Sequence, residues 1–383
     1  MPTREITVQG LCATRFEPLR ERFAALFAND EDLGASMALT IDGEMVVDLW
    51  GGHVDEARTM PWRSDTLTHV WSTTKTMTSL AALLLVERGE LDVDAPVARY
   101  WPTFAANGKG EVLVRHLLGH TSGVPGWAEP VTADVLCDWE RSTTLLAAQA
   151  PWWAPGSASG YHALNYGHLV GEVVRRITGS KPGRFFAEQI ARPLQADFHI
   201  GLAPAEASRV ARVVPPPPLP IDLATLDPAS PMFRTMSNPL PDATVSWTPQ
   251  WQQADIGAAN GHGNARSVAR LQSLIANGGE VDGVRLLSPK TIERIFEPQA
   301  DGVDLVLGLP LKMGLGWGLP MPALPFIPDG RVCFWGGWGG SIVIADADRR
   351  LCFAYMMNRM APGIIGGPNA AALCDTLYRC VGR

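Results

Sequence analysis

The sequence predicts an α/β protein of the α+β type, in which an antiparallel sheet flanked by helices is built from both ends of the chain. Two features support this prediction. Residues 36–52 form β-rich runs around a turn at Asp42-Gly43, and residues 331–358 contain two β-rich runs around a turn at residues 346–350. Helical and loop segments lie between these hairpins. Hairpins join antiparallel strands, whereas a parallel sheet needs alternating strands and helices.

The length of 383 residues exceeds what one hydrophobic core usually serves, which favours two subdomains. We expect an α/β domain made of residues 1–80 and 245–383, and a mostly helical domain made of residues 81–244. Apolar spacing and end signals predict five helices, at residues 17–27, 72–88, 165–179, 264–279 and 370–378. The proline-rich run at residues 213–220 must be extended, either as a rigid surface loop or as a motif that recruits a partner.

Composition and charge argue against several classes of protein. The formal net charge of −7 leaves no dense basic surface for nucleic acid, so we expect no nucleic-acid partner. No apolar run reaches the ~18 residues of a membrane-spanning helix, so we expect no membrane partner. The start of the sequence shows no secretion-signal pattern. The six cysteines are scattered without a CxxC pair, which predicts reduced thiols and a cytoplasmic protein.

The chain has only five lysines, and one of them, Lys75, lies three residues after Ser72 at the start of an apolar helix. Residues three apart share one face of a helix. A serine hydroxyl becomes a nucleophile when a neighbour accepts its proton, and a lysine accepts it only as the neutral amine that apolar burial favours. No other lysine has a serine three residues before it. The alternative is a coincidental pair on a solvated helix.

Other common signals for a reactive site are weak. No serine lies in a Gly-x-Ser-x-Gly elbow, which argues against an α/β-hydrolase. His116 and His120 are four residues apart but lack an HExxH pattern, so a structural loop is favoured over a metal site. The glycines at residues 314–318 and 335–340 do not form the G-x-G-x-x-G loop of a nucleotide site. We expect neither a metal nor an organic cofactor.

Two further segments offer groups for catalysis. Tyr161 and Tyr166 are two of only five tyrosines, and a phenol can pass protons when its pKa is lowered by nearby cations. The alternative for each is a packing residue at the start of a helix. The run WGGWGGS at residues 335–341 places glycines in a strand, where a substrate can approach backbone N–H groups that stabilise an oxyanion. The alternative is a glycine bulge.

The order of these groups resembles that of class C β-lactamases and serine penicillin-binding proteins. The segments are most similar to those of the family VIII carboxylesterases, in the order WSTTK, LLGHTSGVP, PGSASGYHALNYGHLVGEVVRR, GHGNARSVARL and WGGWGG. The resemblance spans about residues 35–360. No single motif identifies the family, but five motifs in the family's order do. It implies a β-lactamase/transpeptidase-like fold with the active site in the cleft between the two domains.

The resemblance also implies a role for each matching residue. Ser72 matches the acylated nucleophile and Lys75 matches its buried general base. Tyr161 matches the tyrosine that carries a proton to the leaving group, because it follows Pro155-Gly156 at the spacing that the family shows. Tyr166 lies five residues later, inside the predicted helix, where a packing role is expected.

The oxyanion site is implied in the same way. Trp335, Gly336 and Gly337 stand where β-lactamases carry Lys-Thr-Gly. The backbone N–H groups of Ser72 and Trp338 would then hold the oxyanion. The missing lysine removes the cation that faces a β-lactam carboxylate, so neutral esters are favoured as substrates.

A second departure concerns the segment around the tyrosine. The Tyr-x-Asn of β-lactamases is replaced by Tyr161-His162-Ala163, so the amide that binds a lactam side chain is missing. Arg359 is the one residue that we consider as a replacement for the lost cation, which keeps weak β-lactam turnover open.

Together these residues predict a serine carboxylesterase that hydrolyses short-chain carboxylic esters through an acyl-serine intermediate, with a small-molecule ester as its partner. A β-lactamase, a D-Ala-D-Ala peptidase or an acyltransferase would use the same acyl-enzyme and remain alternatives. A catalytically silent binding or scaffold protein of this fold is a further alternative. The presence of Ser72, Lys75 and Tyr161 together argues against it.

Overall fold

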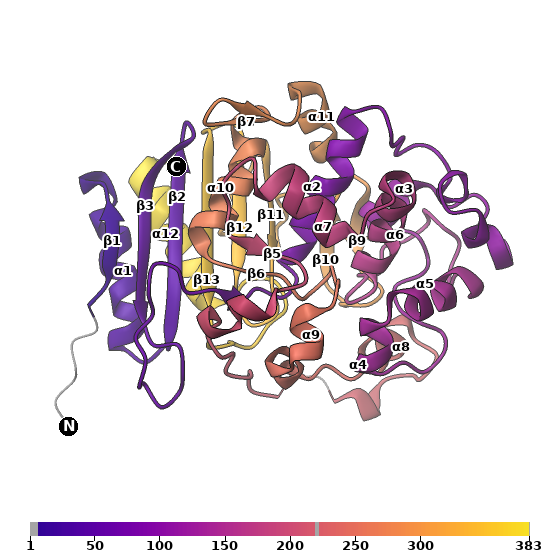
Figure 1. Cartoon of the computed structure of the whole chain (residues 1–383), viewed down its shortest axis with the longest axis horizontal. Helices are drawn as coiled ribbons and strands as arrows, with labels where there is room; N and C mark the ends of the chain where they lie inside the picture. The colour runs from indigo at the N-terminus through magenta and orange to yellow at the C-terminus, as the bar shows by residue number, and fades with distance from the viewer. Residues whose placement is uncertain (1–6, 219–221, 383) are drawn as a thin grey trace.

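The computed structural model describes residues 7–218 and 222–382. Its main sheet is antiparallel and has six strands in the order β1-β3-β2-β13-β12-β11 (Figure 1). The strands are β1 (Gln9–Cys12), β2 (Gly34–Ile41), β3 (Glu44–Gly52), β11 (Val332–Gly336), β12 (Ile342–Asp346) and β13 (Leu351–Met357). The two ends of the chain meet where β2 pairs with β13, with Ala35 opposite Met357 and Ile41 opposite Leu351. The predicted antiparallel sheet built from both termini is therefore confirmed.

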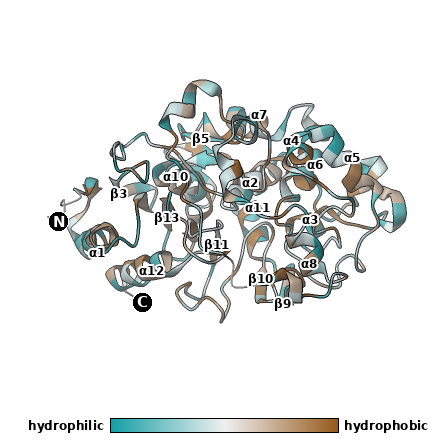
Figure 2. Ribbon diagram, turned by 90° about the horizontal axis from the view of Figure 1, so that it is seen from below, coloured by the Kyte–Doolittle hydropathy of each residue, from teal (hydrophilic) through white to brown (hydrophobic). Residues whose placement is uncertain are grey.

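Helices cover both faces of this sheet (Figure 2). Helix α10 (Ala265–Ala276) packs on β2, β12 and β13, while α1 (Glu17–Ala28) and α12 (Pro368–Val381) pack together on the opposite face. Every residue of β12 and β13 is buried. A strand covered on both faces needs apolar side chains at successive positions, which explains the continuous apolar runs near the C-terminus.

The remaining helices gather beyond the β11 edge of the sheet (Figure 1). Helix α2 (Thr74–Glu87) is buried along most of its length and packs on α6, α7 and α11. The others are α3 (Val114–Leu118), α4 (Ala133–Cys137), α5 (Trp139–Ala148), α6 (Tyr166–Thr178), α7 (Pro182–Phe186), α8 (Pro231–Met236), α9 (Pro249–Gln253) and α11 (Pro289–Glu293). Within the described ranges, no helix is both long and apolar enough to cross a membrane.

Three small sheets complete the fold. They comprise β4 (Thr68–His69), β6 (His262–Gly263) and β5 (Phe198–His199); β7 (Glu280–Val281) and β8 (Val284–Arg285); and β9 (Ala300–Val303) and β10 (Pro310–Met313). The sheet of β4, β6 and β5 joins segments that are far apart in sequence. It therefore ties the approach to α2 to the segment that precedes α10.

The five predicted helices correspond to α1, α2, α6, α10 and α12. Two details differ from the prediction. Helix α2 begins at Thr74, so Ser72 lies in the turn before the helix. The C-terminal segment forms three strands and not two, because residues 337–341 make a turn between β11 and β12. Gly339 and Gly340 have positive φ angles of 92° and 126°, which glycine adopts without strain.

The proline-rich run is non-helical over residues 213–218, as predicted, and residues 219–220 lie outside the described part of the chain. Its start is fixed against the C-terminal segment and is not a free loop: Val214 N donates to Asn358 O at 2.7 Å, and Met360 N donates to Val214 O at 3.0 Å. The division of the chain into an α/β domain of residues 1–80 and 245–383 and a helical domain of residues 81–244 stays a prediction. Residues 1–6 of the first domain lie outside the part of the chain that the structure describes.

Helix α6 packs unusually closely on the segment before β6. A Cβ atom built on Gly167 would lie 2.5 Å from the backbone nitrogens of Gly257 and Ala258. Backbone atoms at that distance cannot rotate away as a flexible side chain would. Gly167 therefore sets how near the helix and the segment can approach each other.

We predict that Gly167→Ala lowers the melting temperature. Overpacking typically costs about 1–3 kcal/mol, which exceeds the ~1 kcal/mol that alanine gains over glycine in a helix. Gly110→Ala is the matched control, because no atom lies within 4 Å of its added Cβ and its φ is not positive. Thermal unfolding of both variants checks the prediction. Equal melting temperatures would show that Gly167 does not set how closely α6 packs on the segment before β6.

Candidate active site

Ser72 lies in a tight turn between β4 and α2. The residue before it, Trp71, has a φ of 48°, a region that non-glycine residues seldom occupy. Thr74 N donates to Trp71 O, and Lys75 N donates to Ser72 O, both at 3.0 Å. Ser72 is 7% exposed. Such local strain occurs often where a side chain has to be presented for function.

The amine of Lys75 is placed directly beside the Ser72 hydroxyl. Its Nζ is 3.0 Å from Ser72 Oγ, 2.7 Å from Ala163 O and 2.9 Å from Ala258 O. The side chain is 1% exposed. A neutral amine has two N–H groups and one lone pair. With the two carbonyls accepting the N–H groups, the lone pair is left for the Ser72 proton.

Burial decides the charge of this amine. Desolvation lowers the pKa of Lys75 well below its usual range. No ion pair among the described residues involves its Nζ, so no carboxylate offsets this cost. The predicted neutral lysine next to a serine is therefore consistent with the geometry and with the electrostatics.

Tyr161 lies on the other side of the amine. Its ring centroid is 4.7 Å from Lys75 Nζ, and the residue is 2% exposed. The phenol oxygen makes no hydrogen bond of ordinary geometry within the described residues. Burial raises the pKa of Tyr161 above its usual value, and the nearby Ser72 and Trp335 side chains oppose this only partly. In the resting protein Tyr161 is a neutral phenol with its proton available.

Tyr166, the other candidate, lies behind α2. Its hydroxyl is 2.7 Å from Ser79 Oγ, which also donates to Lys75 O at 2.8 Å. The residue is fully buried, and its oxygen already has a partner. Its position in the first turn of α6 is that of a packing residue.

The glycine-rich segment brings the edge of the main sheet to Ser72. A Cβ on Gly337 would lie 2.2 Å from Val70 O and 2.3 Å from Ser341 Oγ. Ser341 Oγ also donates to Val70 O at 2.9 Å and is 3.0 Å from Thr73 Oγ1. We expected these glycines to admit a substrate. What approaches Gly337 is instead the backbone carbonyl of Val70, two residues before Ser72, together with the Ser341 hydroxyl.

The four predicted residues of this segment have different positions. Trp335 is buried with its ring centroid 5.4 Å from that of Tyr161. Gly336 packs against the backbone of Gly366 and Ser341, and Gly337 packs against Val70 in the turn before Ser72. Trp338 alone of the four lines the cavity in front of Ser72. The neighbouring Gly337 N and Gly339 N donate to other backbone carbonyls, whereas no hydrogen bond within the described residues uses Trp338 N.

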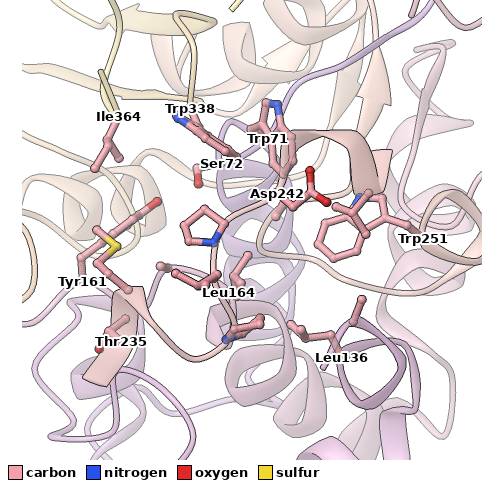
Figure 3. A pocket seen from close by; sticks show the side chains of 18 residues that line it. Trp71, Ser72, Leu136, Tyr161, Leu164, Thr235, Asp242, Trp251, Trp338 and Ile364 are labelled. Atoms are coloured by element: carbon pink, nitrogen blue, oxygen red, sulfur yellow. The ribbon is translucent and has the colours of Figure 1, made fainter. Parts of the chain in front are cut away.

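A cavity of about 200 Å³ opens over Ser72 (Figure 3). Its walls are mainly apolar and aromatic side chains from both parts of the chain, with Ser72 and Tyr161 at one side. The lining includes Trp71, Leu136, Leu164, Met236, Val245, Trp251, Trp338 and Ile364. Asp242 is the one formally charged residue among the described residues that line it. This arrangement suits an uncharged, apolar group placed next to a nucleophile.

The geometry does not support two sequence-based alternatives. Arg359, considered as a cation for the substrate, pairs with Asp30 at 3.0 Å and does not line the cavity. His116 and His120 do not share a helix face, because α3 ends at Leu118. The Nδ1 atom of each ring already accepts a hydrogen bond within the protein. His116 accepts from Leu113 N at 3.2 Å, and His120 accepts from His162 N at 3.1 Å.

Sequence reasoning missed several groups that shape the site. The carbonyls of Ala163 and Ala258 belong to residues whose type carries no signal. Trp251, which forms part of the cavity wall, donates from Nε1 to His69 Nε2 at 2.8 Å. These partners are 182 positions apart, so no local pattern could have identified them. Burial lowers the pKa of His69, which keeps it neutral and able to accept this bond.

Comparisons with known proteins agree with this geometry. The chain is 35% identical over 374 residues to the esterase/beta-lactamase LipL of Mycobacterium tuberculosis, covering 94% of this chain and 84% of LipL. It is 30% identical over 380 residues to the esterase EstB of Burkholderia gladioli, covering 90% and 91% of the two chains. A solved family VIII carboxylesterase superposes with a TM-score of 0.92 at 40% identity, covering 98% of this chain and all of the other.

The sequence profile of one family covers almost the whole chain. The Beta-lactamase family profile matches residues 20–372, which include the Ser72 turn, the Tyr161 segment and the strands β11 to β13. The antiparallel sheet with its flanking helices agrees with that assignment. The chain therefore belongs to the β-lactamase family.

Proposed function

We propose that this protein is a serine carboxylesterase that hydrolyses short-chain carboxylic esters through an acyl-enzyme on Ser72. The observation that carries the proposal is the Lys75 amine, which is buried, has no counter-ion among the described residues and lies 3.0 Å from Ser72 Oγ. LipL, EstB and the solved family VIII carboxylesterase are all named as esterases, which supports the same reaction class.

In the proposed acylation, Ser72 Oγ attacks the ester carbonyl while its proton passes to Lys75 Nζ. The carbonyl oxygen becomes an oxyanion, for which the N–H groups of Ser72 and Trp338 are the proposed donors. Backbone donors fixed before the reaction stabilise this charge without reorganisation. The packing of Gly337 on Val70 supports the assignment, because it fixes the two donor segments relative to each other.

In the next step the C–O bond of the ester breaks. The Tyr161 phenol gives its proton to the leaving alkoxide, and the Lys75 ammonium replaces that proton. An alcohol leaves and Ser72 carries the acyl group. A water molecule then attacks the acyl carbonyl through the same groups in reverse order, which releases the carboxylic acid and restores the Ser72 hydroxyl. The proposed steps use only side chains and backbone groups.

The cavity supports a neutral substrate. Its lining residues include no Lys, Arg or His among the described residues, and its one formal charge is the negative charge of Asp242. A penicillin carries a carboxylate, which would find no cationic partner there. LipL is named as both an esterase and a beta-lactamase, so the balance between the two substrates has to be measured for this chain.

Two further features belong to this proposal. We propose that the site lies between an α/β domain of residues 1–80 and 245–383 and a helical domain of residues 81–244. In support, the cavity is lined by Leu136 and Met236 from the proposed helical domain and by Trp71 and Trp338 from the proposed α/β domain.

We also propose a cytoplasmic location, which is supported by six cysteines that are all free thiols.

The substrate proposal is tested with a short-chain aryl ester, such as p-nitrophenyl butyrate, and a penicillin. We predict that kcat/KM is about 10- to 100-fold higher for the ester, since a missing hydrogen bond to a charged group costs about 1.5–3 kcal/mol. Ser72→Ala should be inactive towards both. Equal kcat/KM values would favour a β-lactamase, and binding of the ester without turnover would favour a silent binding protein.

The roles of the two tyrosines are tested by removing each hydroxyl. Tyr161→Phe should lower kcat by about 10²–10⁴, as expected for an acid–base group, with little change in melting temperature. Tyr166→Phe should keep most activity and lose at most about 1 kcal/mol of stability, since its hydroxyl bonds to Ser79 behind α2 and to no other residue that the structure describes. If Tyr166→Phe is inactive and Tyr161→Phe is active, the role proposed for Tyr161 is contradicted.

A further inference from the structure

Three successive backbone N–H groups around Tyr161 are each bonded to a distant part of the chain. Gly160 N donates to His120 O at 2.9 Å, Tyr161 N donates to Asp304 Oδ1 at 3.0 Å, and His162 N donates to His120 Nδ1 at 3.1 Å. We propose that His120 and Asp304 are positioning residues that hold the Tyr161 hydroxyl in register with Ser72. This inference rests on the proposed proton-transfer role of Tyr161.

His120 holds both neighbours of Tyr161 at once. Its carbonyl accepts from the residue before the tyrosine and its ring accepts from the residue after it. The residue is 2% exposed and has a φ of 61°, in the left-handed region. That strained conformation lets the carbonyl and the side chain of one residue face the same short segment. Its ring also lies 5.1 Å from the Tyr161 ring and 5.0 Å from the Tyr166 ring, measured between centroids.

The protonation state of His120 suits this task. Because Nδ1 accepts from His162 N, the ring proton must be on Nε2. Burial lowers the pKa of His120 well below its usual value, and the nearby His162 and Lys75 would also oppose a positive charge. Burial thus favours the neutral ring, which keeps the acceptor on Nδ1 available to His162 N.

Asp304 secures the tyrosine from the opposite direction. It is fully buried in the loop between β9 and β10, and its Oδ1 accepts from Tyr161 N, from Val306 N at 3.0 Å and from Leu307 N at 2.9 Å. Leu305 N donates to Ser159 O at 2.9 Å in the same contact. The carboxylate thus fixes its own loop and the Tyr161 segment to each other.

The proposed proton transfer requires the Tyr161 hydroxyl to be held in one position. The Tyr161 oxygen makes no hydrogen bond of ordinary geometry within the described residues, and the nearby Ser72 and Trp335 side chains only partly offset the effect of burial on its pKa. Its position depends on the backbone that carries it. A displacement of about 1 Å at a reacting group can cost 10²-fold in rate. Loss of a positioning bond should therefore lower kcat while leaving the cavity, and hence KM, nearly unchanged.

Two substitutions of His120 separate the acceptor from the ring. His120→Phe keeps a planar ring among its aromatic neighbours but removes the acceptor for His162 N. His120→Asn places an amide oxygen near the former Nδ1 and tolerates a φ of 61°. We expect kcat to fall about 10- to 100-fold in His120→Phe, with KM changed by less than about threefold, and we expect His120→Asn to recover most of that loss.

A double-mutant cycle distinguishes positioning from general damage. If His120 acts through the Tyr161 hydroxyl, adding His120→Phe to Tyr161→Phe should change kcat by less than about threefold. The same 10- to 100-fold loss in both backgrounds would overturn the proposal, as would full activity of His120→Phe. If His120→Phe does not fold, Asp304→Leu with Asp304→Asn as its conservative partner repeats the cycle. An active Tyr161→Phe would instead contradict the proposed function itself.

Discussion

The amine of Lys75 is held without a counter-ion among the described residues, and much of the structure serves to keep it so. Its two carbonyl partners come from Ala163, just before α6, and from Ala258, just before β6. The three segments meet only when α2, α6 and the stretch before β6 are packed together, and Gly167 permits the close contact between α6 and that stretch. Burial lowers the pKa of this amine and so favours its neutral form, whose lone pair is free to accept the proton of the serine hydroxyl.

The main sheet contributes the second half of the site. Strand β11 is its edge, and the turn that follows packs Gly337 on Val70, two residues before the nucleophile. Ser341 closes this contact by bonding to Val70 O and Thr73. The sheet is made from the two ends of the chain, so the proposed oxyanion donors depend on pairing between β2 and β13. Fold stability and site geometry are linked through that pairing.

The parts of the site that could be predicted are those with a local pattern. The spacing of Ser72 and Lys75 identifies a shared face near a helix start, and hairpins at the two ends of the chain predict the antiparallel sheet. The carbonyls of Ala163 and Ala258 could not be predicted, because every residue has a carbonyl and the contacts span 88 and 183 positions. The glycines near Trp338 indicate a close approach without indicating what approaches, so the contact of Gly337 with Val70 could not be predicted.

NMR can test directly whether Lys75 is a neutral base at physiological pH, because the chain has only five lysines. Lysine labelled with ¹³C and ¹⁵N gives one side-chain signal per residue, assigned here by Lys75→Arg and Lys109→Arg. We predict that the Lys75 signal has the chemical shift of a neutral amine at pH 7, while Lys109, whose pKa burial lowers to about 8, is mostly charged. A Lys75 signal that titrates near the ordinary lysine pKa of about 10.4 would show that Lys75 is charged at pH 7 and is not the base.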